Sequence, residues 1–235
     1  MITGSPYRSY AFFLLFAGCT FLPLAAPCQE TATETGHVAT IYTTSYSPKD
    51  YTSLIGKCAL SEKLWINHLA LYQGYVKNTN MLNEIIKPML FNGRAETPEF
   101  AELKRRFGWE YNGMRLHELF FQNMGGTGDF PKQGKLRDAI DRQFGGYEIW
   151  LRSATAMAKM RGIGWFVLYQ DVGTGMLINC WIDQHDTGHL AGCKPLLVID
   201  FFEHAYMLDY GLKKSDYFTN LIKHIDWKVV DARFQ

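Results

Sequence analysis

The chain has 235 residues, and 24 Lys and Arg stand against 23 Asp and Glu, for a formal net charge of +1. This balance argues against a dedicated nucleic-acid-binding protein, because such proteins gather a basic excess on one face. Hydrophobic residues make up 47% of the chain and charged residues 20%. These are ordinary proportions for a globular protein and exclude disorder over most of the length.

The N-terminus has the pattern of an export signal. Arg8 precedes the apolar run AFFLLFAGCTFLPLAA, and small residues follow at Ala25 and Ala26. The run is short for a membrane span and is interrupted by proline, although a retained anchor is the alternative. We expect a signal peptide over residues 1–28 and a tail over 29–46. The mature protein would be periplasmic or secreted, with no membrane attachment and with a disulfide permitted but not identified.

Two long helices are predicted next. The first spans 61–88, with Ser61 at its start, because Leu64, His68 and Leu71 recur at helical spacing. Pro, Asn and Gly within 88–97 indicate a turn. The second helix is expected over 98–124, so that residues 47–128 form an antiparallel helical hairpin domain.

The second half of the chain changes character after a glycine-rich linker at 125–134. Residues 129–235 are predicted to form a second domain, a small antiparallel sheet with flanking helices, which makes the whole chain α+β. Helical patterns cover 135–144, 147–161, 201–208 and 217–230, and strand patterns cover 165–170, 176–182 and 195–199.

Four residues could hold a metal ion. Asp200 and His204 are four apart, so on a helix they would share one face. The alternatives are that Asp200 simply caps a helix and that His204 is a hydrogen-bonded core residue. His68 and His117 lie in the middle of apolar helix faces, where an unpartnered imidazole is unfavourable. Three imidazoles and one carboxylate, drawn from both halves of the chain, could close around one ion.

These residues lie in segments that resemble the iron/manganese superoxide dismutases. LLVIDFFEHAYMLDY (196–210) is similar to the D-x-W-E-H-A-Y signature that follows an apolar strand in that family. FGGYEIW, GIGWFVL, LHELFF, GYVKNTN and DYFTNLIKHIDW resemble further family segments in the same order, so the resemblance covers about residues 47 to 234.

The resemblance implies a superoxide dismutase with one iron or manganese ion, whose ligands would be His68, His117, Asp200 and His204. Asn67 is the alternative first ligand, since the family spacing to the conserved tyrosine is eight and His68 stands seven before Tyr75. We choose His68, because imidazole fits the site and a helix bulge could absorb one deletion.

The resemblance also assigns residues around the metal. Tyr75 matches the tyrosine at the mouth of the active-site funnel, and His185 matches the residue that hydrogen-bonds the metal-bound solvent, with Gln184 as the fallback. Glu203 matches a residue that pairs with a ligand histidine of the opposite subunit, which implies a homodimer. An aromatic wall would be supplied by Trp165, Phe121 and Phe202.

The chain departs from the family pattern at two funnel positions. Leu71 and Met207 replace a histidine and a tyrosine that usually pair, so an altered proton relay and pH dependence are expected. Gly113 stands where iron-type members commonly have glutamine, which favours manganese slightly, but a histidine at the position of His185 occurs with either metal, so iron or manganese stays open. Two other functions remain possible: a metal-free structural or binding relative of the same fold, and a non-haem iron oxygenase with two histidines and a carboxylate.

Overall fold

The computed structural model of the chain describes residues 45–235. The predicted signal peptide (1–28) and nearly all of the predicted tail (29–46) lie outside the described residues. Within the described part, no helix is long and apolar enough to cross a membrane. The three cysteines of this part, Cys58, Cys180 and Cys193, are free.

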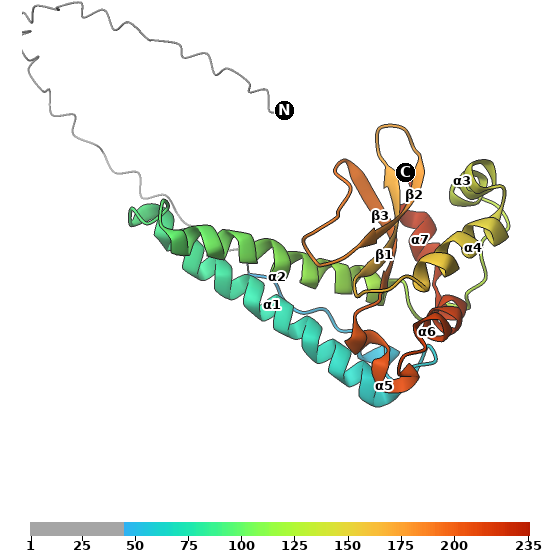
Figure 1. The fold of residues 1–235 in the computed structure, drawn as a ribbon, viewed down its shortest axis with the longest axis horizontal. Coiled ribbons are helices and arrows are strands. Elements are labelled where there is room, and N and C mark those ends of the chain that lie inside the picture. The colour runs from blue at the N-terminus through green and yellow to red at the C-terminus, as the bar shows by residue number, and fades with distance from the viewer. Residues whose placement is uncertain (1–44) are drawn as a thin grey trace, which may run out of the picture. The chain divides into compact units, whose positions relative to one another are not determined.

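The first element is a long helical hairpin, as predicted. Helices α1 (Glu62–Phe91) and α2 (Pro98–Gln122) lie side by side and run in opposite directions (Figure 1). Each helix begins at a side-chain cap: the Ser61 hydroxyl accepts from the Leu64 N–H, and the Thr97 hydroxyl accepts from the Phe100 N–H.

The predicted end of the first helix at Pro88 is wrong. The helix continues to Phe91, and the Asn92 N–H still bonds to the carbonyl of Pro88. Proline removes only its own N–H bond, and the buried side chain of Met89 holds the last turn against the hairpin.

The sheet has three antiparallel strands in the order β2-β1-β3. Strand β1 (Trp165–Asp171) is central, with β2 (Leu177–Ile182) on one side and β3 (Cys193–Asp200) on the other. All of β1 but its last residue is buried, which explains the apolar run from Trp165 to Tyr169. Helix α4 (Tyr147–Ala158) packs on β1 and β2, whereas α2 packs on β3.

The remaining helices flank the sheet, which confirms the α+β fold class. The predicted helix at 201–208 is instead a 3₁₀ turn, Glu203–Ala205, followed by the short α5 (Met207–Tyr210). The predicted helix at 217–230 is broken, because Asp226 turns the chain and caps a new helix. The other elements are α3 (Lys135–Phe144), α6 (Lys214–Leu221) and α7 (Trp227–Arg233).

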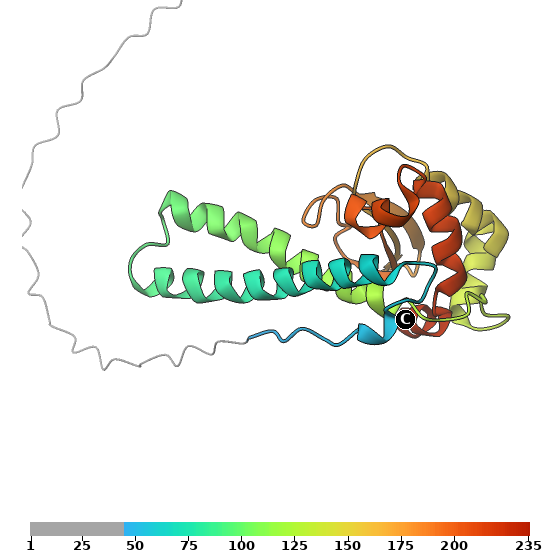
Figure 2. The ribbon, with the colours of Figure 1, turned by 90° about the horizontal axis from the view of Figure 1, so that it is seen from below.

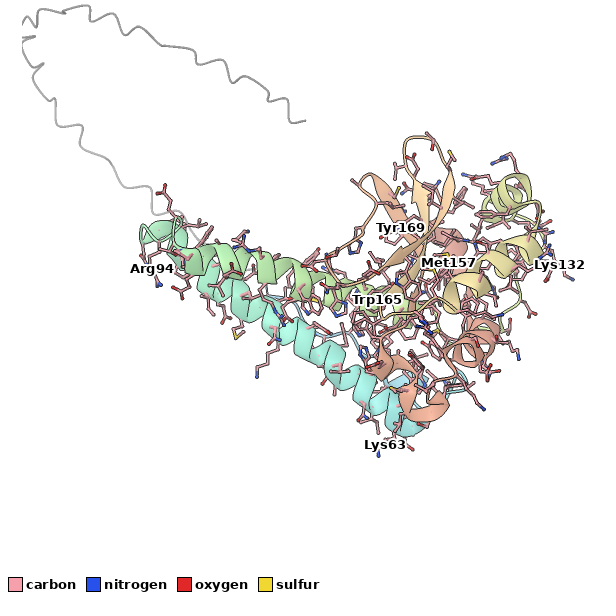
Figure 3. All side chains as sticks on the ribbon, in the orientation of Figure 1. Lys63, Arg94, Lys132, Met157, Trp165 and Tyr169 are labelled. Carbon is pink, nitrogen blue, oxygen red and sulfur yellow. The ribbon has the colours of Figure 1, made fainter. Side chains whose placement is uncertain are left out.

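Residues 47–128 thus contain α1 and α2, and residues 129–235 contain the sheet; the division into two domains stays a prediction. Lys63 and Arg94 mark the two ends of the hairpin in Figure 3, and Figure 2 shows the sheet and its helices gathered at the end near Lys63. The first residue of β1 therefore lies beside the hairpin: Trp165 is labelled where the strand meets α2.

One glycine is required where the sheet meets the hairpin. Gly164 has φ +139°, and a Cβ there would lie 2.1 Å from the carbonyl oxygen of Ile182. Its own carbonyl accepts from the Phe201 N–H at 2.8 Å, and the next residue, Trp165, pairs with Asp200 across the ladder. This close approach places the end of β3 at the start of β1.

Candidate metal centre

Four predicted residues from four elements meet at one point. His68 lies on α1, His117 on α2, Asp200 at the end of β3 and His204 in the 3₁₀ turn that follows. One ligand atom from each lies within 4.8 Å of all the others. The side chains of His68, His117 and Asp200 are fully buried, and that of His204 is 23% exposed. We call this group the His/Asp cluster.

Asp200 is the centre of the cluster. Its Oδ1 accepts a hydrogen bond from the Phe202 N–H at 2.8 Å, which turns Oδ2 toward the histidines. The Nε2 atoms of His68 and His204 lie 3.1 Å from Oδ2, and that of His117 lies 3.6 Å away. The predicted shared helix face is wrong, because Asp200 ends a strand and the chain then turns tightly. The turn brings the two side chains together all the same.

His117 is held so that its free lone pair faces the cluster. Its Nδ1–H donates to the carbonyl oxygen of Gly113 at 2.6 Å, because a carbonyl can only accept. Nε2 therefore carries no proton, and this atom is buried without a hydrogen-bond partner. A buried polar atom without a partner is unfavourable, and a cation within the cluster would satisfy it. The residues therefore fit a bound metal ion.

The charges of the cluster residues also fit a bound metal ion. Burial raises the pKa of Asp200, but His204 and His68 lower it further, so its pKa lies well below the usual range. Burial lowers the pKa of His68 and of His117, which keeps both imidazoles neutral. A carboxylate oxygen and imidazole nitrogens are ligands that suit a mid-row divalent or trivalent ion. Without a cation, a carboxylate buried this deeply is costly.

Aromatic rings lie around the cluster, and the three rings named from the sequence are among them. The ring of Phe121 lies 5.1 Å from that of His68 between centroids, and the Trp165 ring lies 5.1 Å from that of His117. Phe202 packs against His204 at 5.7 Å. Of the four cluster side chains, only His204 is in part exposed.

Tyr75, His185 and Trp165 form a hydrogen-bonded chain beside the cluster. The indole N–H of Trp165 donates to His185 Nδ1 at 3.1 Å, so the imidazole proton resides on Nε2. Nε2–H then donates to the hydroxyl oxygen of Tyr75 at 2.7 Å, which leaves the Tyr75 proton free for another acceptor. Burial lowers the pKa of His185 to about 4 and raises that of Tyr75 to about 12. Gln184, the fallback, is exposed.

A cavity of about 980 Å³ leads from the surface to Tyr75 and His204. Leu71 and Met207, which replace the family's polar pair, both line it and are each 41% exposed. Asn67 also lines it and is exposed, so its side chain lies outside the buried cluster that contains His68. Glu203 is at the rim.

Helix α1 needs no bulge between His68 and Tyr75. It is an unbroken α-helix, in which seven residues make nearly two turns and place both side chains on one face. The expected bulge is therefore wrong, although the choice of His68 agrees with its place in the cluster. The roles of the cluster residues as ligands stay a prediction.

Sequence reasoning missed the polar wall of the cavity. Arg106, Glu110 and Asn78 line it, and the Tyr75 ring packs on the backbone of Gly113. The signal was present: residues 106, 110, 113 and 117 recur at helical spacing on α2, so they share the face of His117.

Comparison with known proteins agrees with this geometry. The family description "Iron/manganese superoxide dismutases, C-terminal domain" matches residues 132–233. A superoxide dismutase [Fe] of Cupriavidus metallidurans is 36% identical over 180 residues, which cover 74% of this chain and 88% of that protein. A superoxide dismutase [Mn] of Haloferax volcanii is 32% identical over 191 residues, covering 80% and 92%. A superoxide dismutase [Mn/Fe] of Aeropyrum pernix is 32% identical, covering 75% and 83%.

Proposed function

The chain belongs to the iron/manganese superoxide dismutase family and is an oxidoreductase of superoxide, and we propose that it converts superoxide to dioxygen and hydrogen peroxide with one ion held by the His/Asp cluster. The relatives are named as iron, manganese and manganese/iron enzymes, so the cofactor is iron or manganese. When bound, either ion supplies one-electron oxidation and one-electron reduction.

The observation that carries the proposal is the buried, unprotonated Nε2 of His117, aimed at Asp200 Oδ2. A core histidine with a purely structural role would satisfy both ring nitrogens. Here the Gly113 carbonyl fixes one nitrogen and leaves the other for an ion. The three histidines and Asp200 would be its ligands.

Tyr75 is suited to supply a proton to the substrate. Reduction of superoxide to hydrogen peroxide consumes two protons, which must reach a site walled by aromatic rings. The Tyr75 hydroxyl lines the cavity, and His185 Nε2–H occupies one of its lone pairs. The hydroxyl proton is thereby directed away from His185. Its pKa of about 12 keeps the hydroxyl protonated at neutral pH.

We propose that His185 and Trp165 act by positioning Tyr75. The indole N–H of Trp165 sets the tautomer of His185, and that tautomer makes His185 a donor to Tyr75. An imidazole in this tautomer has a single N–H, and this one is used. The predicted bond from His185 to metal-bound solvent would therefore require the proton to be shared or the ring to shift.

We also propose a homodimer whose partner subunit covers the apolar side of the cavity. Exposed Leu71, Met207 and Leu208 form an apolar side, and Glu203 lies beside them. A partner subunit would bury these side chains and place its own residues near His204. Sedimentation equilibrium should give twice the mass of the mature chain, and a monomer at micromolar concentration would contradict the proposal.

Export remains a proposal. If residues 1–28 are a signal peptide, mass spectrometry of the protein from its native host should find a mature N-terminus near residue 29. An intact N-terminus on protein in the cytoplasm would contradict export.

The function is tested by metal reconstitution. Metal-free protein is loaded with iron or with manganese separately, and superoxide consumption is measured after pulse generation. One loaded form at least should consume superoxide catalytically, and the His204→Ala protein should not. A preparation that retains neither metal and has no activity would favour a structural relative. Oxygen uptake that depends on an organic substrate would favour an oxygenase.

A further inference from the structure

Arg106 is the one cationic side chain among the described residues that line the cavity. The carboxylates of Glu110 and Glu203 line it as well. A net charge of +1 over the whole chain supplies little general attraction for an anion. The arrival of an anion at Tyr75 therefore depends on where this single cation is held.

Arg106 is fixed by a buried partner. Its Nε donates to Glu110 Oε1 at 2.7 Å, and its Nη2 lies 2.5 Å from the same oxygen. The Asn78 amide donates to the other carboxylate oxygen at 3.2 Å, and Glu110 is only 2% exposed. The guanidinium also lies over the Trp109 ring, 5.6 Å from its centroid.

The pair is oriented with its positive end outward. The Arg106 side chain is 56% exposed, whereas the Glu110 side chain is 2% exposed. The Nη1 group of Arg106 has no hydrogen-bond partner within residues 45–235, so two N–H donors remain available at the cavity. These donors belong to the exposed member of the pair, whereas the Glu110 carboxylate is buried.

The Arg106 guanidinium is linked to Tyr75 through ring contacts and one hydrogen bond. Trp109, on which it lies, packs against His185 at 4.6 Å between ring centroids, and His185 is bonded to Tyr75. Leu71 and Met207 also line the cavity, but their apolar side chains have no hydrogen-bond donor for an anion. Of these lining side chains, the Arg106 guanidinium is therefore the one suited to bind an anion.

We propose that Arg106 receives the anionic substrate at the cavity entrance and that Glu110, by holding it, determines where the anion enters. The identity of the substrate rests on the proposed function, whereas the binding of a small anion does not.

The test removes the ion pair without changing the net charge. The double variant Arg106→Gln with Glu110→Gln leaves no unpaired buried carboxylate and keeps the chain at its original charge. The matched control is Arg105→Gln with Glu102→Gln, an exposed ion pair on the same helix that does not line the cavity. Arg106→Lys keeps the positive charge and serves as the rescue.

Two readouts separate this inference from the proposed function. The first is kcat/KM for superoxide at low and high ionic strength. The second is azide binding, followed in the visible spectrum of metal-loaded protein, which needs no turnover. We expect the Arg106/Glu110 double variant to lose about three- to tenfold in both at low ionic strength, with the loss vanishing at high salt. The control pair should remain within about twofold of the parent, and Arg106→Lys, which keeps the charge but not both contacts to Glu110, should lose less than the double variant.

Equal azide affinity in the two double variants would overturn the role of Arg106, whatever the activity. A parent protein that binds azide but consumes no superoxide would instead overturn the proposed function and leave the anion site standing. A loss that persists unchanged at high salt would mean that the double variant disturbs packing, and would also refute electrostatic attraction.

Discussion

Substituting Gly113 by alanine should displace the proton donor without touching the His/Asp cluster. A Cβ at this position would lie 2.6, 2.8 and 2.9 Å from three ring carbons of Tyr75. Carbon atoms in contact normally stand about 3.5–4.0 Å apart, so the ring must move by about 1 Å. The His117 Nδ1–H donates to the backbone carbonyl of Gly113, which a side chain at position 113 does not alter, so this hydrogen bond should survive.

A displacement of the Tyr75 ring by about 1 Å is enough to break its hydrogen bond to His185. Tyr75 Oη and His185 Nε2 are 2.7 Å apart, and a 1 Å shift along that line would exceed hydrogen-bond range. Overpacking costs about 1–3 kcal/mol and the lost bond about 1 kcal/mol. Alanine recovers about 1 kcal/mol through helix propensity. We expect a net loss of about 2 kcal/mol in unfolding free energy and at least about tenfold in kcat.

Gly108→Ala is the matched control, because it lies on the same helix and its Cβ would make only ordinary contacts at 3.6 Å or more. It should be as stable as the parent or more so, with full activity. The assays are urea unfolding, metal content and superoxide turnover. The reasoning fails if Gly113→Ala matches Gly108→Ala in stability and turnover, or if its crystal structure shows Tyr75 unmoved.

Two further changes test the cluster and its neighbour. His204→Ala should abolish metal retention, whereas His185→Ala should retain metal and lose rate, as metal analysis beside kinetics would reveal; full metal content in the His204 variant would contradict its role as ligand. The metal-free protein should lose stability as pH falls from about 6.5 toward 4, because burial depresses the pKa of His185 to about 4 and the unfolded chain then binds more protons. The shift of His185 corresponds to about 3 kcal/mol, measured by urea unfolding across that range, and His185→Gln should reduce the slope, to which His68 and His117 also contribute. An unchanged slope in that variant would assign the pH dependence to other groups.

Helices and strands could be predicted from the sequence where neighbouring residues determine them, and not where distant contacts do. The hairpin and the strands follow from spacing, and the ends of α3 at Lys135 and Phe144 were predicted correctly. Capping and periodicity act over a few residues, so they can be read directly. The overrun of α1 beyond Pro88 was missed, because the burial of Met89 is a tertiary effect.

The turn after β3 illustrates a second limit. Asp200 and His204 were expected on one helix face, yet they meet through a strand end and a 3₁₀ turn. Side chains four apart can converge in either geometry, so the spacing alone does not distinguish them. The capping and metal alternatives also proved compatible, since one Asp200 oxygen bonds the Phe202 N–H and the other faces the histidines.

Residues that meet only through long-range packing were the hardest to predict from the sequence. The resemblance indicated His68, His117 and Tyr75, but nothing in it pointed to Arg106 or Glu110. Their position in the cavity lining follows from the packing of α1 against α2, which the structure shows. A helical wheel drawn from His117 would have put both residues on the correct face of α2.

The most direct measurement is anomalous diffraction from crystals of the reconstituted protein, recorded at the iron and manganese absorption edges. We predict a single anomalous peak within the His/Asp cluster, about 2 Å from the three Nε2 atoms and from Asp200 Oδ2. An active protein whose only peak lies elsewhere, or whose cluster holds no ion, would contradict the account.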